Sequence, residues 1–71
     1  MKVKDLLNVI KDCIILVDAY ENDAYIMEGY TYTIPEEYHE DVVRSIYARN
    51  ALNDLGIGLY IFISIFNHNS I

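Results

Sequence analysis

The stretch "GIGLYIFISIF", residues 56–66, decides how this chain folds, because it is long, uncharged and strongly apolar. Two sets of side chains alternate along it. One set is aliphatic: Ile57, Leu59, Ile61, Ile63 and Ile65. The other is mostly aromatic: Gly58, Tyr60, Phe62, Ser64 and Phe66. A period of two is typical of a β-strand. The apolar run is also far shorter than the roughly 20 residues of a membrane-spanning helix. We therefore predict a central or interface strand and no membrane partner.

Residues 1–12, "MKVKDLLNVIKD", have a different period. Their apolar side chains fall at i, i+3, i+4 and i+7: Val3, Leu6, Leu7 and Ile10. This spacing predicts an amphipathic helix of about three turns. Such a helix is marginal alone, so we expect its apolar side to pack on a sheet, against the isoleucine face of residues 56–66.

Two further strands precede the acidic middle of the chain. Residues 13–20, "CIILVDAY", and residues 25–34, "YIMEGYTYTI", are rich in β-branched and aromatic side chains. Asn22 and Asp23 tolerate the left-handed backbone of a turn, so the two strands should form a hairpin. Alternation places Glu28 and Tyr30 on one face and Tyr25 on the other. Gly29 indicates a bulge or a close backbone approach.

The segment after Pro35 is ambiguous. We expect "PEEYHED" to form an exposed loop or a single helical turn. Residues 42–49 are dense in β-forming side chains and favour a fourth strand, but the segment up to Gly56 also fits a helix. The predicted fold is α+β: one domain over residues 1–71, with an N-terminal helix on a four-stranded antiparallel sheet. The alternative has two helices and three strands.

Charge and cysteine content restrict the function. Eleven acidic and five basic residues give a net charge of −6, which disfavours direct binding of nucleic acid. The single cysteine, Cys13, cannot form an internal disulfide, and no secretory signal pattern opens the sequence. These features predict a cytoplasmic protein. A hydrophobic content of 54% exceeds what one small core encloses, so we expect a homo-oligomer, most simply a dimer.

No residue pattern predicts a reaction. Cys13 lies in an apolar run, where a thiol keeps its proton, and the histidines lack a signature spacing to any nucleophile. The acids around the turn at Asp23 lack the order and the glycine of a calcium loop. We therefore predict a protein that is not an enzyme and has no catalytic residue, no metal and no cofactor.

Two groups of residues are candidates for binding. The first is an acidic loop with aromatic neighbours, which imitates phosphates and bases and so suits a basic groove on another protein. Its members and their tyrosine anchors are Glu36, Glu37, Tyr38, Glu40, Asp41, Tyr30 and Tyr32. A purely solvated face is the alternative for these acids. The second group is the aromatic face of the last strand, Tyr60, Phe62 and Phe66, which we assign to the oligomer interface.

Three segments carry a resemblance: "MKVKDLLNVI" at residues 1–10, "IPEEY" at residues 34–38 and "VVRSIYA" at residues 42–48. They resemble a set of short accessory proteins encoded by phages and mobile elements of Gram-positive bacteria. The resemblance implies an N-terminal helix followed by antiparallel strands, and "NALNDLG" departs from it. Similarly small acidic phage proteins include inhibitors of bacterial immunity such as anti-CRISPRs.

Two functional hypotheses follow. The first is a phage-type binding protein in the host bacterial cell that inhibits a defence or nucleic-acid-handling protein by occupying its surface. The second is a small oligomer that binds a nucleotide or other small molecule at the subunit interface. For an anionic ligand that site would need basic side chains drawn from Arg44, Arg49, Lys2, Lys4 and Lys11. A structural component whose last strand pairs with its symmetry mate is a third possibility.

Overall fold

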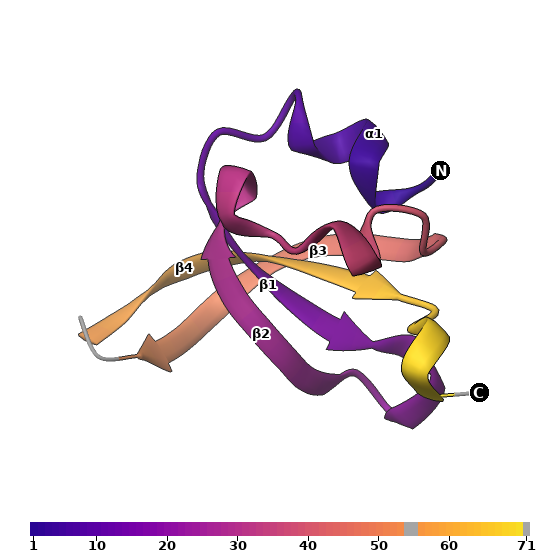
Figure 1. Cartoon of the computed structure of the whole chain (residues 1–71). Helices are drawn as coiled ribbons and strands as arrows, with labels where there is room; N and C mark the ends of the chain where they lie inside the picture. The colour runs from indigo at the N-terminus through magenta and orange to yellow at the C-terminus, as the bar shows by residue number, and fades with distance from the viewer. Residues whose placement is uncertain (54–55, 71) are drawn as a thin grey trace.

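The computed structural model describes residues 1–53 and 56–70. It is an α+β fold with one short helix and a four-stranded sheet (Figure 1). The main elements are α1 (Val3–Leu7), β1 (Cys13–Asp18), β2 (Ala24–Tyr30), β3 (Val43–Asn53) and β4 (Gly56–Ile65). Four single 3-10 turns are η1 (Ala19–Glu21), η2 (Thr31–Thr33), η3 (Glu36–Tyr38) and η4 (His68–Ser70). The fourth strand and the single helical turn after Pro35 are thus confirmed, and the arrangement with two helices and three strands is wrong.

The sheet is mixed, so the prediction of a fully antiparallel sheet is wrong. Its strand order is β2-β1-β4-β3. The outer pairs are antiparallel hairpins, whereas β1 and β4 run parallel, with Ile14 opposite Ile61 and Leu16 opposite Ile63. The cause is the connection over residues 31–42, which carries the chain from the β2 edge to the β3 edge. The returning strand, β4, then fills the position beside β1 in the same direction.

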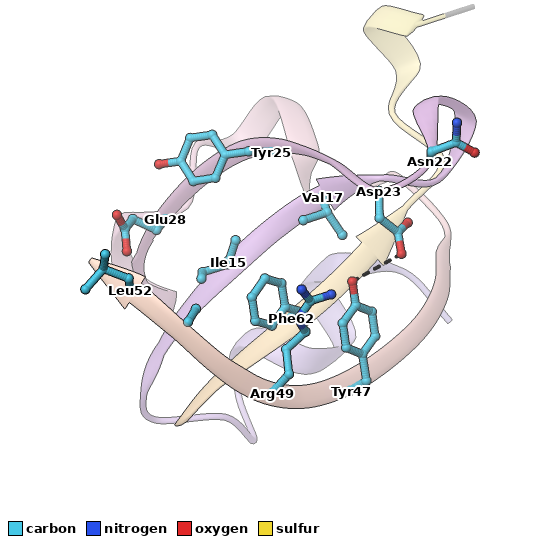
Figure 2. Close-up of a pocket in the computed structure, with 11 residues that line it drawn as sticks. Ile15, Val17, Asn22, Asp23, Tyr25, Glu28, Tyr47, Arg49, Leu52 and Phe62 are labelled. Atoms are coloured by element: carbon cyan, nitrogen blue, oxygen red, sulfur yellow. Dashed lines mark hydrogen bonds between the residues drawn. The ribbon is translucent and has the colours of Figure 1, made fainter. Parts of the chain in front are cut away.

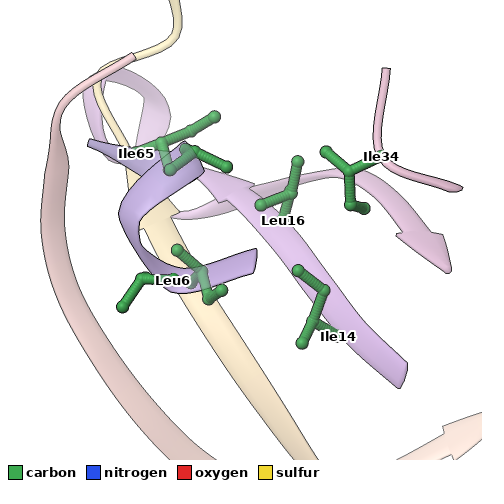
Figure 3. Close-up of a cluster of buried hydrophobic side chains, with 7 residues drawn as sticks. Leu6, Ile14, Leu16, Ile34 and Ile65 are labelled. Atoms are coloured by element: carbon green, nitrogen blue, oxygen red, sulfur yellow. The ribbon is translucent and has the colours of Figure 1, made fainter. Parts of the chain in front are cut away.

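The core lies between one face of this sheet and a cover made by α1 and the crossover of residues 31–42 (Figures 1 and 3). Its buried members are Val3, Leu6, Ile14, Leu16, Ile34, Ile63 and Ile65. The helix therefore packs on the isoleucine face of β4, as expected, but only at the C-terminal half of the strand. Ile57 and Leu59 on the same face are 80% and 71% exposed.

The helix is shorter than the predicted three turns, and this explains the uncovered half of β4. It begins with the Asp5 carboxylate accepting the backbone N–H of Lys2 at 2.9 Å. It ends at Leu7, because Asn8 and the β-branched Val9 favour leaving the helix. Val9 is 70% exposed, so only Val3, Leu6 and their neighbours contribute to the core.

A bulge changes which side chains of β2 share a face. The register shifts between Leu16, opposite Met27, and Val17, opposite Tyr25. Ile26 and Met27 therefore both pack on the core, while Tyr25 and Glu28 both line the other side of the sheet. The predicted separation of Tyr25 from Glu28 is wrong for this reason.

Gly29 lies at a close approach, as expected. A Cβ at this position would be 2.6 Å from the Thr33 hydroxyl, which donates a hydrogen bond to the Tyr30 carbonyl at 2.7 Å. This contact belongs to the turn that ends β2 at Tyr30, four residues earlier than predicted. The chain then enters the crossover.

Candidate binding surfaces

The face of the sheet opposite α1 contains a hollow of about 410 Å³ (Figure 2). Ile15 and Val17 of β1 form its floor and are only 6% and 3% exposed. Phe62 of β4 lies beside them, and Tyr47 and Arg49 of β3 form one wall. All four strands contribute, because the sheet curls around this face. A hollow of this size falls within the range of sites that bind small molecules.

The hollow has an aromatic and cationic side. Phe62 and Tyr47 stack with ring centroids 5.3 Å apart and an interplanar angle of 3°. The guanidinium carbon of Arg49 lies 5.5 Å from the centroid of the Phe62 ring, a cation–π arrangement. No carboxylate among the described residues lies within ion-pair distance of Arg49. Its exposed guanidinium is therefore held by an aromatic ring and remains open to an anionic group.

Asp23 closes one end of the hollow. Its carboxylate accepts hydrogen bonds from the Tyr47 hydroxyl at 3.1 Å and from the Ser64 hydroxyl at 2.5 Å (Figure 2 shows the first). Asn22 and Asp23 both have positive φ, 53° and 57°, as the turn chemistry predicted. Burial, the hydrogen bond that the Tyr47 hydroxyl donates to Asp23, and the charge of Asp23 raise the pKa of Tyr47. The turn before β2 is thus tied across the sheet to β3 and β4.

Two of the four acids in the loop, Glu40 and Asp41, have partners within the chain at 2.9 Å or less. Glu40 forms ion pairs with Lys2 at 2.6 Å and with Lys4 at 2.8 Å. Hydrogen bonds from these two lysines lower the pKa of Glu40 to about 2, and the same contact raises the pKa of Lys4. Because Lys2 and Lys4 already pair with a carboxylate, they are poor candidates for binding an anionic ligand.

Asp41 is the second paired acid. It is 7% exposed, and it accepts a hydrogen bond from the His68 backbone N–H at 3.3 Å and contacts His68 Nδ1 at 2.9 Å. Tyr38 also packs on His68, with centroids 5.9 Å apart. Burial, followed by the charges of Glu37 and Asp41, raises the pKa of Tyr38. Asp41 and Tyr38 thus fix the C-terminal segment. The acids presented outward are Glu36 and Glu37, of which Glu37 has its Oε2 3.9 Å from His68 Nε2.

The two remaining tyrosine anchors form a separate feature. Tyr30 and Tyr32 stack on each other with centroids 5.5 Å apart and an interplanar angle of 6°. They are 52% and 83% exposed and lie where β2 ends, whereas Tyr38 lies near η4. The predicted protein-binding residues are therefore divided between a stacked tyrosine pair and the outward acids of η3.

The three aromatic residues predicted as an oligomer interface are also divided. Phe62 lines the hollow, and Phe66, beyond the end of β4, packs on Tyr20 with centroids 5.2 Å apart. The fully buried Ser64 lies between them in sequence. Tyr60 is half-buried, with its ring within 3.6 to 3.8 Å of a Cβ placed at Gly58.

Sequence reasoning did not group Arg49, Tyr47, Tyr25 and Glu28 into one site. Tyr47 and Arg49 are two residues apart in β3. The alternation of side chains along a strand therefore predicts that they share one face of the sheet. The bulge that joins Tyr25 to Glu28 has no comparable signal in the sequence.

Over residues 1–53 and 56–70, no group of three or more His, Cys, Asp or Glu side chains is placed to hold a metal ion. The described part of the chain also has no helix with the length and apolar character needed to cross a membrane. No protein-family model matches the chain, and neither the curated proteins nor the solved structures include a significant match.

Proposed function

We propose that the protein is a non-enzymatic, phage-type binding protein that inhibits a bacterial defence or nucleic-acid-handling protein in the host cytoplasm. It occupies the target's surface, as anti-CRISPR-like proteins do. The observation that carries this proposal is the uneven charge. Residues 1–42 contain ten acidic and three basic residues, a net charge of −7, whereas residues 43–71 have a net charge of +1. A basic groove built for phosphates attracts such an acidic body.

The outward acids of η3 supply the contact in this proposal. Glu36 and Glu37 are exposed on a single turn, and the stacked pair of Tyr30 and Tyr32, where β2 ends and the crossover begins, offers a separate exposed aromatic surface. Exposed carboxylates resemble phosphates in charge, and exposed aromatic rings resemble bases in shape. Glu40 and Asp41 contribute to the fold of the loop through Lys2 and His68.

A target is identified by affinity capture of the tagged protein from lysate of a Gram-positive host, and binding is then measured with the purified target. Reversing Glu36→Lys and Glu37→Lys together should weaken binding at least about tenfold and reduce its salt dependence. The matched control, Asp12→Lys with Glu21→Lys, makes the same charge change at exposed acids elsewhere and should weaken binding less. Equal loss in both variants would show only a general charge effect and would remove η3 from the contact.

A second function is favoured by the hollow. We propose as the alternative that a nucleotide or other small molecule binds there, with Phe62 and Tyr47 stacking on its ring and Arg49 binding its anionic group. Native mass spectrometry of the untagged protein should then reveal excess mass, and Arg49→Ala should remove it while Arg44→Ala should not. A hollow that stays empty in protein from a native host would end this alternative.

A further inference from the structure

The hollow has a carboxylate and a guanidinium on different sides of its apolar floor. Glu28 of β2 lies opposite Ile15 of β1, and Ile15 lies opposite Phe62 of β4, so the three form one row across the sheet. The guanidinium carbon of Arg49 lies 5.5 Å from the centroid of the Phe62 ring. Figure 2 shows Ile15 between Glu28 and Arg49. Because neighbouring strands are about 4.8 Å apart, the two ends of this row are separated by about 10 Å.

Both charged groups are open to a ligand. Among the residues that the structure describes, neither Glu28 nor Arg49 forms an ion pair, and both are exposed. The other carboxylate of the hollow, Asp23, already accepts hydrogen bonds from the hydroxyls of Tyr47 and Ser64. Glu28 is therefore the carboxylate in the described lining that can accept hydrogen bonds from a ligand.

We propose that the hollow selects a guanine nucleotide with a single phosphate group. The base lies over Ile15 and beside Phe62, with its hydrogen-bonding edge turned toward Glu28 and its phosphate bound by Arg49. This inference rests on the second function proposed above, the binding of a small molecule in the hollow, and it names the class of that molecule.

The carboxylate of Glu28 selects the base. An ionised carboxylate accepts hydrogen bonds and cannot donate one. Guanine presents two adjacent donors on one edge, N1–H and the N2 amino group, which match the two carboxylate oxygens. Adenine and cytosine each place an acceptor nitrogen beside their amino group, and uracil flanks its single N–H with two carbonyl oxygens. These acceptors would face the carboxylate with repulsion, so guanine is the favoured base.

The guanidinium of Arg49 limits the number of phosphates. A planar guanidinium binds one phosphate group through two parallel hydrogen bonds. The chain has a net charge of −6, and Lys2 and Lys4 already pair with Glu40. Each further phosphate would therefore add repulsion without a matching cation, and a monophosphate fits the hollow best.

The test is titration calorimetry of the untagged full chain, after dialysis, with three probes: guanosine, inosine and adenosine monophosphate. Guanosine monophosphate should bind at least about tenfold more tightly than adenosine monophosphate, because a misplaced acceptor leaves polar groups unpaired. Inosine monophosphate has the N1–H but no amino group, so its affinity should lie between the other two.

A substitution at Glu28 should change which base is preferred. Glu28→Gln replaces one acceptor oxygen by a donor amide, and an amide matches the donor and acceptor of adenine. The variant should bind guanosine monophosphate at least about tenfold more weakly than the wild type and should prefer adenosine monophosphate. The control Asp12→Asn removes an exposed carboxylate outside the hollow and should leave all three affinities unchanged. Circular dichroism checks that each variant keeps its fold.

The outcomes separate this inference from the function on which it rests. Equal affinities for the three probes, or a Glu28→Gln variant that weakens all three equally, would overturn the selection of guanine and leave nucleotide binding in the hollow standing. Arg49→Ala should weaken all three probes by a similar factor, since each carries the same phosphate. A wild-type protein that binds none of them at millimolar concentration would overturn both the inference and nucleotide binding in the hollow.

Discussion

Replacing Asp23 should show how much one carboxylate contributes to the free energy of unfolding. The Asp23→Ala substitution removes the acceptor of the Tyr47 and Ser64 hydroxyls. A hydrogen bond to a charged group contributes about 1.5–3 kcal/mol. The Ser64 hydroxyl is fully buried and would lose its partner, whereas the partly exposed Tyr47 hydroxyl can bond to water. We therefore assign about 2 kcal/mol to the Ser64 bond and about 1 kcal/mol to the Tyr47 bond.

The backbone adds a further cost. Asp23 has a φ of 57°, a left-handed conformation that costs an ordinary residue about 1–2 kcal/mol. The total for Asp23→Ala is about 4–5 kcal/mol. A chain of 71 residues is expected to have an unfolding free energy of about 4–10 kcal/mol. The substitution should therefore remove a large part of the stability and partly unfold the protein at moderate urea concentrations.

Two other substitutions separate the contribution of the hydrogen bonds from that of the left-handed backbone. Asp23→Asn keeps an acceptor oxygen and tolerates left-handed backbone, so it should cost the least, about 1–2 kcal/mol. Asp23→Gly removes the acceptor but accepts the backbone, so it should fall between Asn and Ala. Urea unfolding followed by circular dichroism gives the free energies. The exposed Asp12→Ala is the control and should stay within about 0.5 kcal/mol of the wild type.

A double-mutant cycle completes the test. If the Asp23–Ser64 bond carries the effect, Asp23→Ala should cost clearly less in a Ser64→Ala background than in the wild type, because that hydroxyl is already absent. The reasoning would be refuted by an Asp23→Ala cost below about 1 kcal/mol, or by costs that add independently of Ser64.

Three further predictions concern the core and the crossover. Leu16→Ala empties a fully buried position and should lower the unfolding free energy by about 2–5 kcal/mol in urea, whereas Val9→Ala should stay within about 0.5 kcal/mol. Gly29→Ala should cost about 1 kcal/mol in the same assay, because its Cβ displaces the Thr33 hydroxyl from its bond, and a Thr33→Ala background, which has no γ atom to displace, should make the added cost of the methyl group smaller. Glu40 has a pKa of about 2, below its usual 4.5, so its ion pairs stabilise the fold above pH 4.5 and this contribution is lost as the pH falls towards 2. The stability difference between wild type and Glu40→Gln should therefore shrink over that range, and a constant difference would contradict the ion-pair interpretation.

The local elements of the fold were predictable from sequence, but the way they join was not. The alternation in residues 56–66 predicted β4, and the β-forming side chains of residues 42–49 predicted β3. Hydrophobic periodicity contains no information on which strands become neighbours. The parallel pairing of β1 with β4 depends on the crossover of residues 31–42, whose path is determined by contacts distant in sequence. One of these is the backbone N–H of Val3 donating to the Asp41 carbonyl at 3.0 Å.

The candidate sites, like the fold, could be predicted from the sequence only in part. The sequence predicted an acidic segment with a single helical turn. It did not indicate which of the four acids point outward and which have close partners within the chain. Asp41 and His68 are 27 residues apart, and no spacing rule joins them. The hollow was missed because it requires the bulge in β2 and the curl of the sheet, which together bring Glu28 and Arg49 to one site.

The strand β4 explains why one sequence pattern supported two interpretations. Near its C-terminus it is a central strand, with Ile63 and Ile65 fully buried on one face and Ser64 on the other. Near its N-terminus it belongs to a hairpin that extends past the helix, and the same alternation leaves Ile57 exposed. The length of α1 determines where this change occurs, because a helix of five residues covers only part of the row. The same alternation therefore belongs to a buried strand at one end of β4 and to an exposed hairpin at the other, and the extent of the cover over the sheet makes the difference.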